Sequence, residues 1–214
     1  MQLTLKNKTV LVTAKRGSGK SNIIKHLITA EQDSFKEIFL ICPTEGVNRF
    51  FSDFIDENNI FETYDERWVE ALIQKMTKLN TGKYGAALTT VLLVLDDCVA
   101  DARLHQSPTI KRLFARGRHI GIGVIVTTQY LFSVPPIIRG NSDFILCGQM
   151  NRQSLGLLCD EYQSGNIDRA EFTKMYNNST KNYGFLLINN NCVSDCDDLN
   201  QIYGIVRCPA QLVR

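Results

Sequence analysis

Eight residues near the start of the chain have the types and the spacing of a phosphate-binding loop, Ala14-Lys15-Arg16-Gly17-Ser18-Gly19-Lys20-Ser21. Gly17 and Gly19 allow the backbone to turn so that successive N–H groups point into one concavity, and a helix beginning there adds its positive dipole end. Lys20 supplies a cation for the β- and γ-phosphates of a nucleoside triphosphate, and the Ser21 hydroxyl is suited to binding Mg²⁺. We therefore predict a site for ATP and Mg²⁺ here, with Asn22 as its last nucleotide-binding residue.

Three polar residues follow two apolar runs further along the chain. Asp96 comes directly after the run at 90–95, where its carboxylate would hold Mg²⁺ directly or through water. Asp97 is then a candidate base for the attacking water, and the alternative is a helix cap or a solvated acid. Gln129 ends the run at 122–128, where it could sense the γ-phosphate and orient the water, or simply bond the loop backbone.

Two arginines flank Gly117 just before the run at 122–128 and have no acidic partner in the local sequence. Arg118, and second to it Arg116, could reach the γ-phosphate of a neighbouring subunit and stabilise the charge of phosphoryl transfer. That role requires a ring of subunits. The alternative roles are contact with a nucleic-acid backbone or plain solubility.

Strands and helices that position these residues are predicted to alternate over roughly the first 150 residues. Such alternation favours an α/β fold with a mostly parallel central sheet flanked by helices. The continuous apolar run at 90–95 is typical of a central strand that is covered on both faces. Strands are expected at 10–13, 37–42, 90–95, 122–128 and 144–147, helices at 18–30, 68–79, 108–118, 152–161 and 167–176, and a closing strand pair at 183–188 and 201–206.

Composition narrows the class of protein. The 214 residues suit a single domain, 1–214, and the chain shows no internal repeat and no run of the ~20 apolar residues that a membrane span requires. Its seven cysteines are odd in number and several lie in apolar runs, which favours reduced thiols inside a cell over a disulfide framework. Cys192 and Cys196 lack further ligands nearby, so a zinc site there is not expected.

Taken in order, the motifs resemble a known group of proteins. They are the loop at 14–21, Val-Leu-Asp-Asp at 94–97, Arg-His at 118–119 before a strand ending in Thr-Thr-Gln, and Val-Pro-Pro-Ile-Ile-Arg-Gly-Asn at 134–141. This combination resembles the DNA-packaging ATPases of poxviruses, other large DNA viruses and virophages, a branch of the FtsK/HerA superfamily. The resemblance extends from Val10 to about Cys147.

The resemblance implies a P-loop NTPase fold of the additional-strand, RecA/FtsK-HerA type. It also implies a Mg²⁺-dependent ATPase that assembles into a ring of roughly five or six subunits. Such a ring would drive double-stranded viral DNA into a preformed capsid, dock on capsid vertex proteins, and work in the host cytoplasm at the viral assembly site or with the virion. Lys20, Ser21 and Asp96 would bind nucleotide and metal, Asp97 would act as base, Gln129 as sensor and Arg118 as the trans-acting arginine.

The net charge of the chain is only +2, but residues 102–142 contain no acid. Several subunits that pool their fields in one channel can bind DNA phosphates without a large net charge. We therefore expect some of the basic residues of this stretch to face such a channel, while a solvated helix face is the plain alternative. The DNA-contact candidates are Arg103, Lys111, Arg112 and Arg139.

Two other functions fit parts of the sequence. Another FtsK/HerA-like DNA translocase, acting in DNA transfer or segregation, would share every catalytic residue named above. A nucleotide-dependent switch would usually select guanine through an Asn-Lys-x-Asp type segment after a strand, and the sequence has none. We therefore expect a packaging motor first, another translocase second and a switch third.

Overall fold

The structure is a computed structural model, and it describes residues 3–98, 104, 106–193 and 196–208. Its strands are β1 (Thr9–Thr13), β2 (Glu37–Ile41), β3 (Ile60–Phe61), β4 (Val91–Leu95), β5 (Ile122–Thr128), β6 (Phe144–Cys147), β7 (Gly184–Asn189) and β8 (Tyr203–Arg207). Its α-helices are α1 (Lys20–Glu31), α2 (Glu45–Asn48), α3 (Glu66–Leu79), α5 (Pro108–Arg116), α6 (Pro136–Gly140), α7 (Arg152–Tyr162), α8 (Arg169–Ser179) and α9 (Leu199–Ile202). Three of the short 3-10 turns matter below, η5 (Gly117–Ile120), η6 (Leu131–Ser133) and η7 (Lys181–Tyr183).

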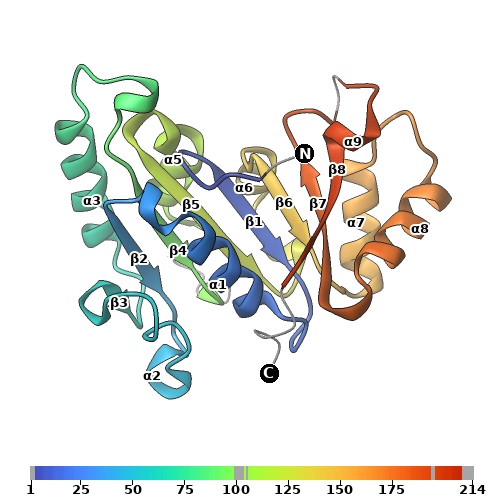
Figure 1. The fold of residues 1–214 in the computed structure, drawn as a ribbon, viewed down its shortest axis with the longest axis horizontal. Helices are drawn as coiled ribbons and strands as arrows, with labels where there is room; N and C mark the ends of the chain where they lie inside the picture. The colour runs from blue at the N-terminus through green and yellow to red at the C-terminus, as the bar shows by residue number, and fades with distance from the viewer. Residues whose placement is uncertain (1–2, 99–103, 105, 194–195, 209–214) are drawn as a thin grey trace.

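The eight strands of the described residues join one sheet in the order β3-β2-β4-β5-β1-β6-β7-β8 (Figure 1). The first six strands of that order pair in parallel, while β7 is antiparallel to β6 and β8 is antiparallel to β7. The predicted α/β class, the mostly parallel sheet and the C-terminal strand pair are therefore confirmed. Because β5 lies between β4 and β1, the arrangement has the additional strand that the resemblance implied.

Side chains that alternate along each strand pack into two apolar cores, one on each face of the sheet. On one face α1 packs with Ile23, Ile24 and Ile28 against β1, β4 and β5. On the other face α3, α5, α6, α7 and α8 contribute, for example through Val69, Leu113 and Phe172. Burial on both faces explains why β4 is continuously apolar and why β5 is apolar until it ends in Thr127 and Thr128.

Local differences from the sequence prediction have simple backbone reasons. The first helix begins at Lys20 and not at 18, because Gly19 has a left-handed φ of 85°. A short helix that the sequence analysis did not predict, α6, begins at Pro136, because the N–H that proline lacks has no partner in the first turn of a helix. The predicted helix at 108–118 ends at Arg116 and continues as the tighter turn η5. In the part of the chain that is described, no helix has the length and hydropathy to span a bilayer.

Candidate nucleotide-binding and catalytic site

The phosphate-binding loop connects the carboxyl end of β1 to the amino end of α1. Two hydrogen bonds fix the start of the loop. The Ala14 N–H donates to the Thr128 carbonyl at the end of β5 at 3.1 Å, and the Lys15 N–H donates to the Gln149 carbonyl just after β6 at 2.6 Å. Gly17 turns the chain with a φ of 73°, a left-handed backbone that side-chain-bearing residues adopt only with strain. The loop is thus fixed between β5 and the segment after β6, as a phosphate cradle requires.

The predicted nucleotide-binding residues divide into buried and exposed members. Ala14, Ser18 and Lys20 are buried, whereas Lys15, Arg16 and Gly17 are exposed on the loop and Gly19, Ser21 and Asn22 are half-buried. The Lys20 Nζ donates to the Ala14 carbonyl at 3.1 Å and to the Lys15 carbonyl at 3.4 Å, so its ammonium lies inside the curve of the loop. Burial lowers the pKa of Lys20, while the nearby charges of Asp97 and Asp96 act in the opposite direction.

Asp96 and Asp97 directly follow β4, and the hydroxyl of one threonine forms a hydrogen bond with each of them. The Thr127 hydroxyl donates to Asp96 Oδ1 at 2.7 Å and accepts the Asp97 backbone N–H at 2.9 Å. The Cys42 thiol also contacts Asp96 Oδ2 at 3.8 Å. Sequence reasoning did not assign a role to Thr127 or Cys42. The available signal was a hydroxyl near the end of an apolar strand, Thr127, two residues before Gln129.

Asp96 is buried, with only 4% of its surface exposed. Burial raises the pKa of Asp96 to about 6, and the charge of Asp97 adds to this increase. The Thr127 hydrogen bond, the Lys20 charge and the Cys42 contact lower the pKa but do not outweigh burial. The carboxylate is therefore kept in a place where its negative charge is costly unless a cation accompanies it.

Asp97 and Gln129 lie together although 32 residues separate them in the sequence. The Gln129 Nε2 donates to Asp97 Oδ1 at 3.5 Å, across the ends of β4 and β5. Asp97 has a φ of 51°, which is uncommon for a residue other than glycine and turns the chain sharply after the strand. The arrangement places a carboxylate and an amide side by side at the edge of the sheet where the phosphate loop also lies.

The donors at this edge fit Mg²⁺. Mg²⁺ binds oxygen ligands, takes one or two carboxylates, and usually keeps waters and substrate phosphates in its remaining positions. Asp96 offers a carboxylate in an environment that disfavours its uncompensated charge, and Ser21 offers a hydroxyl in the first turn of α1. Within the described residues there is no group of three or more His, Cys, Asp or Glu that could hold a metal ion.

Both candidate arginines lie at the opposite edge of the sheet. Arg116 ends α5 and Arg118 lies in η5, which precedes the amino end of β5, whereas the phosphate loop follows the carboxyl end of β1. The Arg118 Nη1 is 4.0 Å from the Asp143 carboxylate, and its side chain is 55% exposed. These arginines therefore do not reach the nucleotide site of their own chain, and a role at a phosphate would require a second copy.

The four DNA-contact candidates have different environments. Lys111 is half-buried and Arg112 is exposed on α5, where Arg112 forms an ion pair with Glu70. Arg139 is buried, and its Nε donates to Glu161 at 2.7 Å while its Nη1 donates to the Val134 carbonyl. The charge of Arg139 is thus satisfied inside the fold, so among the described candidates Lys111 and Arg112 are the ones that solvent reaches more freely. Arg103 lies outside the described residues.

The sequence of this chain matches one known protein family. The sequence profile described as "Poxvirus A32 protein" matches residues 2–202, which is most of the molecule. The chain belongs to this family. The chain is also similar to the uncharacterized protein 075L of Invertebrate iridescent virus 6, with 27% identity over 202 residues, 94% of this chain and 77% of that protein. The uncharacterized protein L437 of Acanthamoeba polyphaga mimivirus is 22% identical over 198 residues, 87% of this chain and 68% of that protein.

Two solved structures show the same fold as this chain. The genome packaging NTPase B204 from Sulfolobus turreted icosahedral virus 2, in complex with AMPPCP, has a TM-score of 0.64 at 22% identity and covers 94% of this chain and 98% of that chain. The pCW3 conjugation coupling protein TcpA has a TM-score of 0.52 at 18% identity and covers 67% of this chain and 49% of that chain. The A32-family chain thus shares the fold of the NTPase B204 over nearly its whole length.

Proposed function

We propose that this chain is a Mg²⁺-dependent ATPase that translocates double-stranded viral DNA into a preformed capsid. The observation that carries the proposal is the meeting of three segments at one edge of the sheet. The phosphate loop follows β1, the carboxylates follow β4, and Gln129 follows β5, the strand between them. Membership of the poxvirus A32 protein family supports the viral context, and the fold shared with the packaging NTPase B204 supports the packaging role.

In the proposed reaction the loop N–H groups and Lys20 hold the β- and γ-phosphates. Asp97 accepts a proton from the attacking water, and Gln129, which already bonds the Asp97 carboxylate, orients that water. Aspartate is one methylene shorter than glutamate, so the left-handed backbone of Asp97 would help to direct its carboxylate. Thr127 positions both acids through its single hydroxyl.

Asp96 and Ser21 would hold Mg²⁺, which when bound neutralises charge on the β- and γ-phosphate oxygens. Arg118, or second to it Arg116, would stabilise the same charge from a neighbouring subunit. This assignment agrees with the distance of both arginines from their own loop and with the exposure of Arg118. A ring of roughly five or six copies would supply these trans contacts.

DNA contact is proposed for the basic face of α5, where the half-buried Lys111 and the exposed Arg112 lie, and capsid vertex proteins are the proposed docking partner. A second candidate function is DNA transfer by a conjugation-type translocase. The fold shared with the coupling protein TcpA favours it, although TcpA covers less of this chain than B204 does. A gene for a major capsid protein beside the gene for this chain would favour packaging over transfer.

Steady-state ATP hydrolysis, measured while long double-stranded DNA is titrated into the purified protein, tests the proposal. We expect DNA to stimulate hydrolysis, with a steep dependence on protein concentration because the arginine acts between subunits. Lys20→Ala and Asp97→Asn should abolish turnover, and Lys174→Ala, an exposed lysine on α8, should leave it unchanged. Turnover that survives Lys20→Ala would refute the ATPase assignment, and turnover indifferent to DNA at every protein concentration would refute an autonomous motor.

A further inference from the structure

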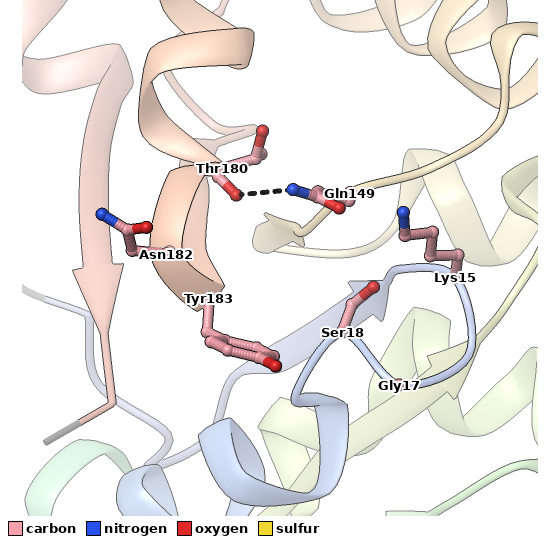
Figure 2. A pocket seen from close by; sticks show the side chains of 8 residues that line it. Lys15, Gly17, Ser18, Gln149, Thr180, Asn182 and Tyr183 are labelled. Atoms are coloured by element: carbon pink, nitrogen blue, oxygen red, sulfur yellow. Dashed lines mark hydrogen bonds between the residues drawn. The ribbon is translucent and has the colours of Figure 1, made fainter. Parts of the chain in front are cut away.

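A cavity adjoins the outer side of the phosphate loop and is not used by the catalytic residues described above (Figure 2). Its volume is about 380 Å³, within the range of small-molecule sites. One wall belongs to the phosphate loop, and the other belongs to the chain after β6 and to the turn η7 that precedes β7. The lining residues are Lys15, Gly17, Ser18, Gln149, Thr180, Asn182, Tyr183 and Gly184.

The aromatic ring of Tyr183 lies directly against the loop. A Cβ built on Gly19 would be 3.6 Å from Tyr183 Cδ1, which means that the ring packs at contact distance on the last glycine before α1. The tyrosine is nevertheless 51% exposed, so much of its surface is free to meet a ligand. In Figure 2 the ring projects from η7 toward the strand-to-helix loop that bears Gly17 and Ser18.

The surrounding structure holds Tyr183 in a strained backbone conformation. Asn182 and Tyr183 are consecutive left-handed residues, with φ values of 52° and 58°, and neither is glycine. Each such residue costs of the order of 1–3 kcal/mol and persists only where the surroundings impose it. Gly184 follows under close constraint, because a Cβ there would come within 2.2 Å of the Ser179 carbonyl oxygen. The turn therefore presents the ring at a defined place.

Polar groups complete the cavity. The Ser18 side-chain oxygen is buried and has no hydrogen-bond partner among the described residues, and Figure 2 shows it directed to the side of the loop where Gln149 lies. The Gln149 Nε2 donates to the Thr180 carbonyl at 3.4 Å, which joins the two walls. A buried hydroxyl without a partner is costly, and a ligand that bonds it would remove that cost.

We propose that this cavity binds the nucleoside part of the nucleotide whose phosphates the loop holds. The base stacks on Tyr183, and the Ser18 hydroxyl bonds the ribose or the adjoining phosphate oxygen. A polyphosphate alone would need cations and N–H groups but no aromatic face, whereas every nucleobase has a π-face that stacks on a tyrosine. The inference rests on the proposed function, because it takes the ligand of the phosphate loop to be a nucleoside triphosphate.

Calorimetric titration with the non-hydrolysable analogue AMPPCP and with inorganic tripolyphosphate, both with Mg²⁺, tests the assignment. For Tyr183→Ala we expect AMPPCP affinity to fall about tenfold, as for loss of one stacked base, and tripolyphosphate affinity to stay unchanged. Tyr183→Phe keeps the ring and should bind AMPPCP like the wild type. Tyr183→Leu keeps apolar bulk without an aromatic face and should lose affinity like the alanine variant. Tyr84→Ala, which removes a tyrosine that is 83% exposed elsewhere, is the matched control.

The possible results separate the two proposals. Equal losses for AMPPCP and tripolyphosphate in Tyr183→Ala would overturn the stacking role, because the tyrosine would then only support the loop. Unchanged AMPPCP affinity in Tyr183→Ala and Tyr183→Leu would also overturn it, while Lys20→Ala would still lose both ligands and leave the proposed function standing. A wild-type protein that binds neither ligand would overturn the proposed function and this assignment with it.

Discussion

Replacing Asp96 by asparagine should stabilise the nucleotide-free protein, and the gain should depend on pH. Asparagine has nearly the same shape, and its carbonyl oxygen can still accept the Thr127 hydrogen bond that Asp96 Oδ1 accepts at 2.7 Å. What the substitution removes is a buried negative charge beside Asp97. The same substitution should abolish Mg²⁺-dependent hydrolysis. The wild-type carboxylate would therefore lower the stability of the nucleotide-free protein while being required for its activity.

The magnitude follows from the raised pKa of Asp96, about 6 in the fold against an ordinary value of 3.8. Because the folded protein holds the proton more tightly than the unfolded chain, the stability linked to this proton is fully present below the ordinary pKa and is lost as the pH rises toward 6. Above that pH the ionised group costs about 3 kcal/mol. Near pH 4 the cost falls to about 0.5 kcal/mol, since the proton then stays bound in the folded state.

Urea unfolding in EDTA, at pH values between 4 and 8, measures this effect. The midpoint of Asp96→Asn should exceed that of the wild type near pH 8, and the difference should shrink steadily toward pH 4. Asp143→Asn is the matched control, because Asp143 is equally buried but accepts hydrogen bonds from the Thr9 N–H, the Thr9 hydroxyl and Lys8.

The control should move in the opposite direction. Burial would raise the pKa of Asp143, but the Thr9 and Lys8 interactions outweigh it, and its pKa lies below the ordinary value. Its ionised form therefore stabilises the fold above the ordinary pKa, and this contribution is lost as the pH falls through the lowered pKa. Asp143→Asn should cost roughly 1–3 kcal/mol near neutral pH. If Asp96→Asn destabilised the protein by the same amount at every pH, the argument that Asp96 is a costly buried charge would be refuted.

Three further predictions concern the basic residues. Arg139→Ala should lower the free energy of unfolding by roughly 2–4 kcal/mol in urea titrations, because Glu161 and the Val134 carbonyl lose a buried partner; a change below 0.5 kcal/mol would contradict its structural role. Arg118→Ala should leave ATP affinity intact but lower turnover about 10³-fold, and mixing it with Lys20→Ala protein should restore some hydrolysis if the arginine acts in trans. Neutralising Lys111 and Arg112 together should reduce the salt dependence of DNA affinity by up to two charges, and an unchanged slope in a filter-binding series would exclude the α5 face.

The sequence was sufficient where function depends on a local pattern. The phosphate loop, the strand before it and the helix after it are adjacent in the chain, so glycine spacing and hydrophobic periodicity predict them together. The sheet class was also predictable, because strands covered on both faces must be continuously apolar and their alternation with helices favours parallel pairing. Lys20 lies inside the curve of the loop, as that local pattern implies.

Contacts between distant segments were decided by the tertiary structure alone. No periodicity indicates that the Thr127 hydroxyl would join Asp96 to Asp97, or that Gln129 would bond Asp97, because strand order in the sheet determines which strand ends are neighbours. The same holds for Arg139, whose nearest acid in the sequence is Asp143 but whose guanidinium pairs with Glu161, 22 residues away. A charge in a sequence has no fixed environment, so only the packed fold determines whether it faces solvent, a ligand or an opposite charge.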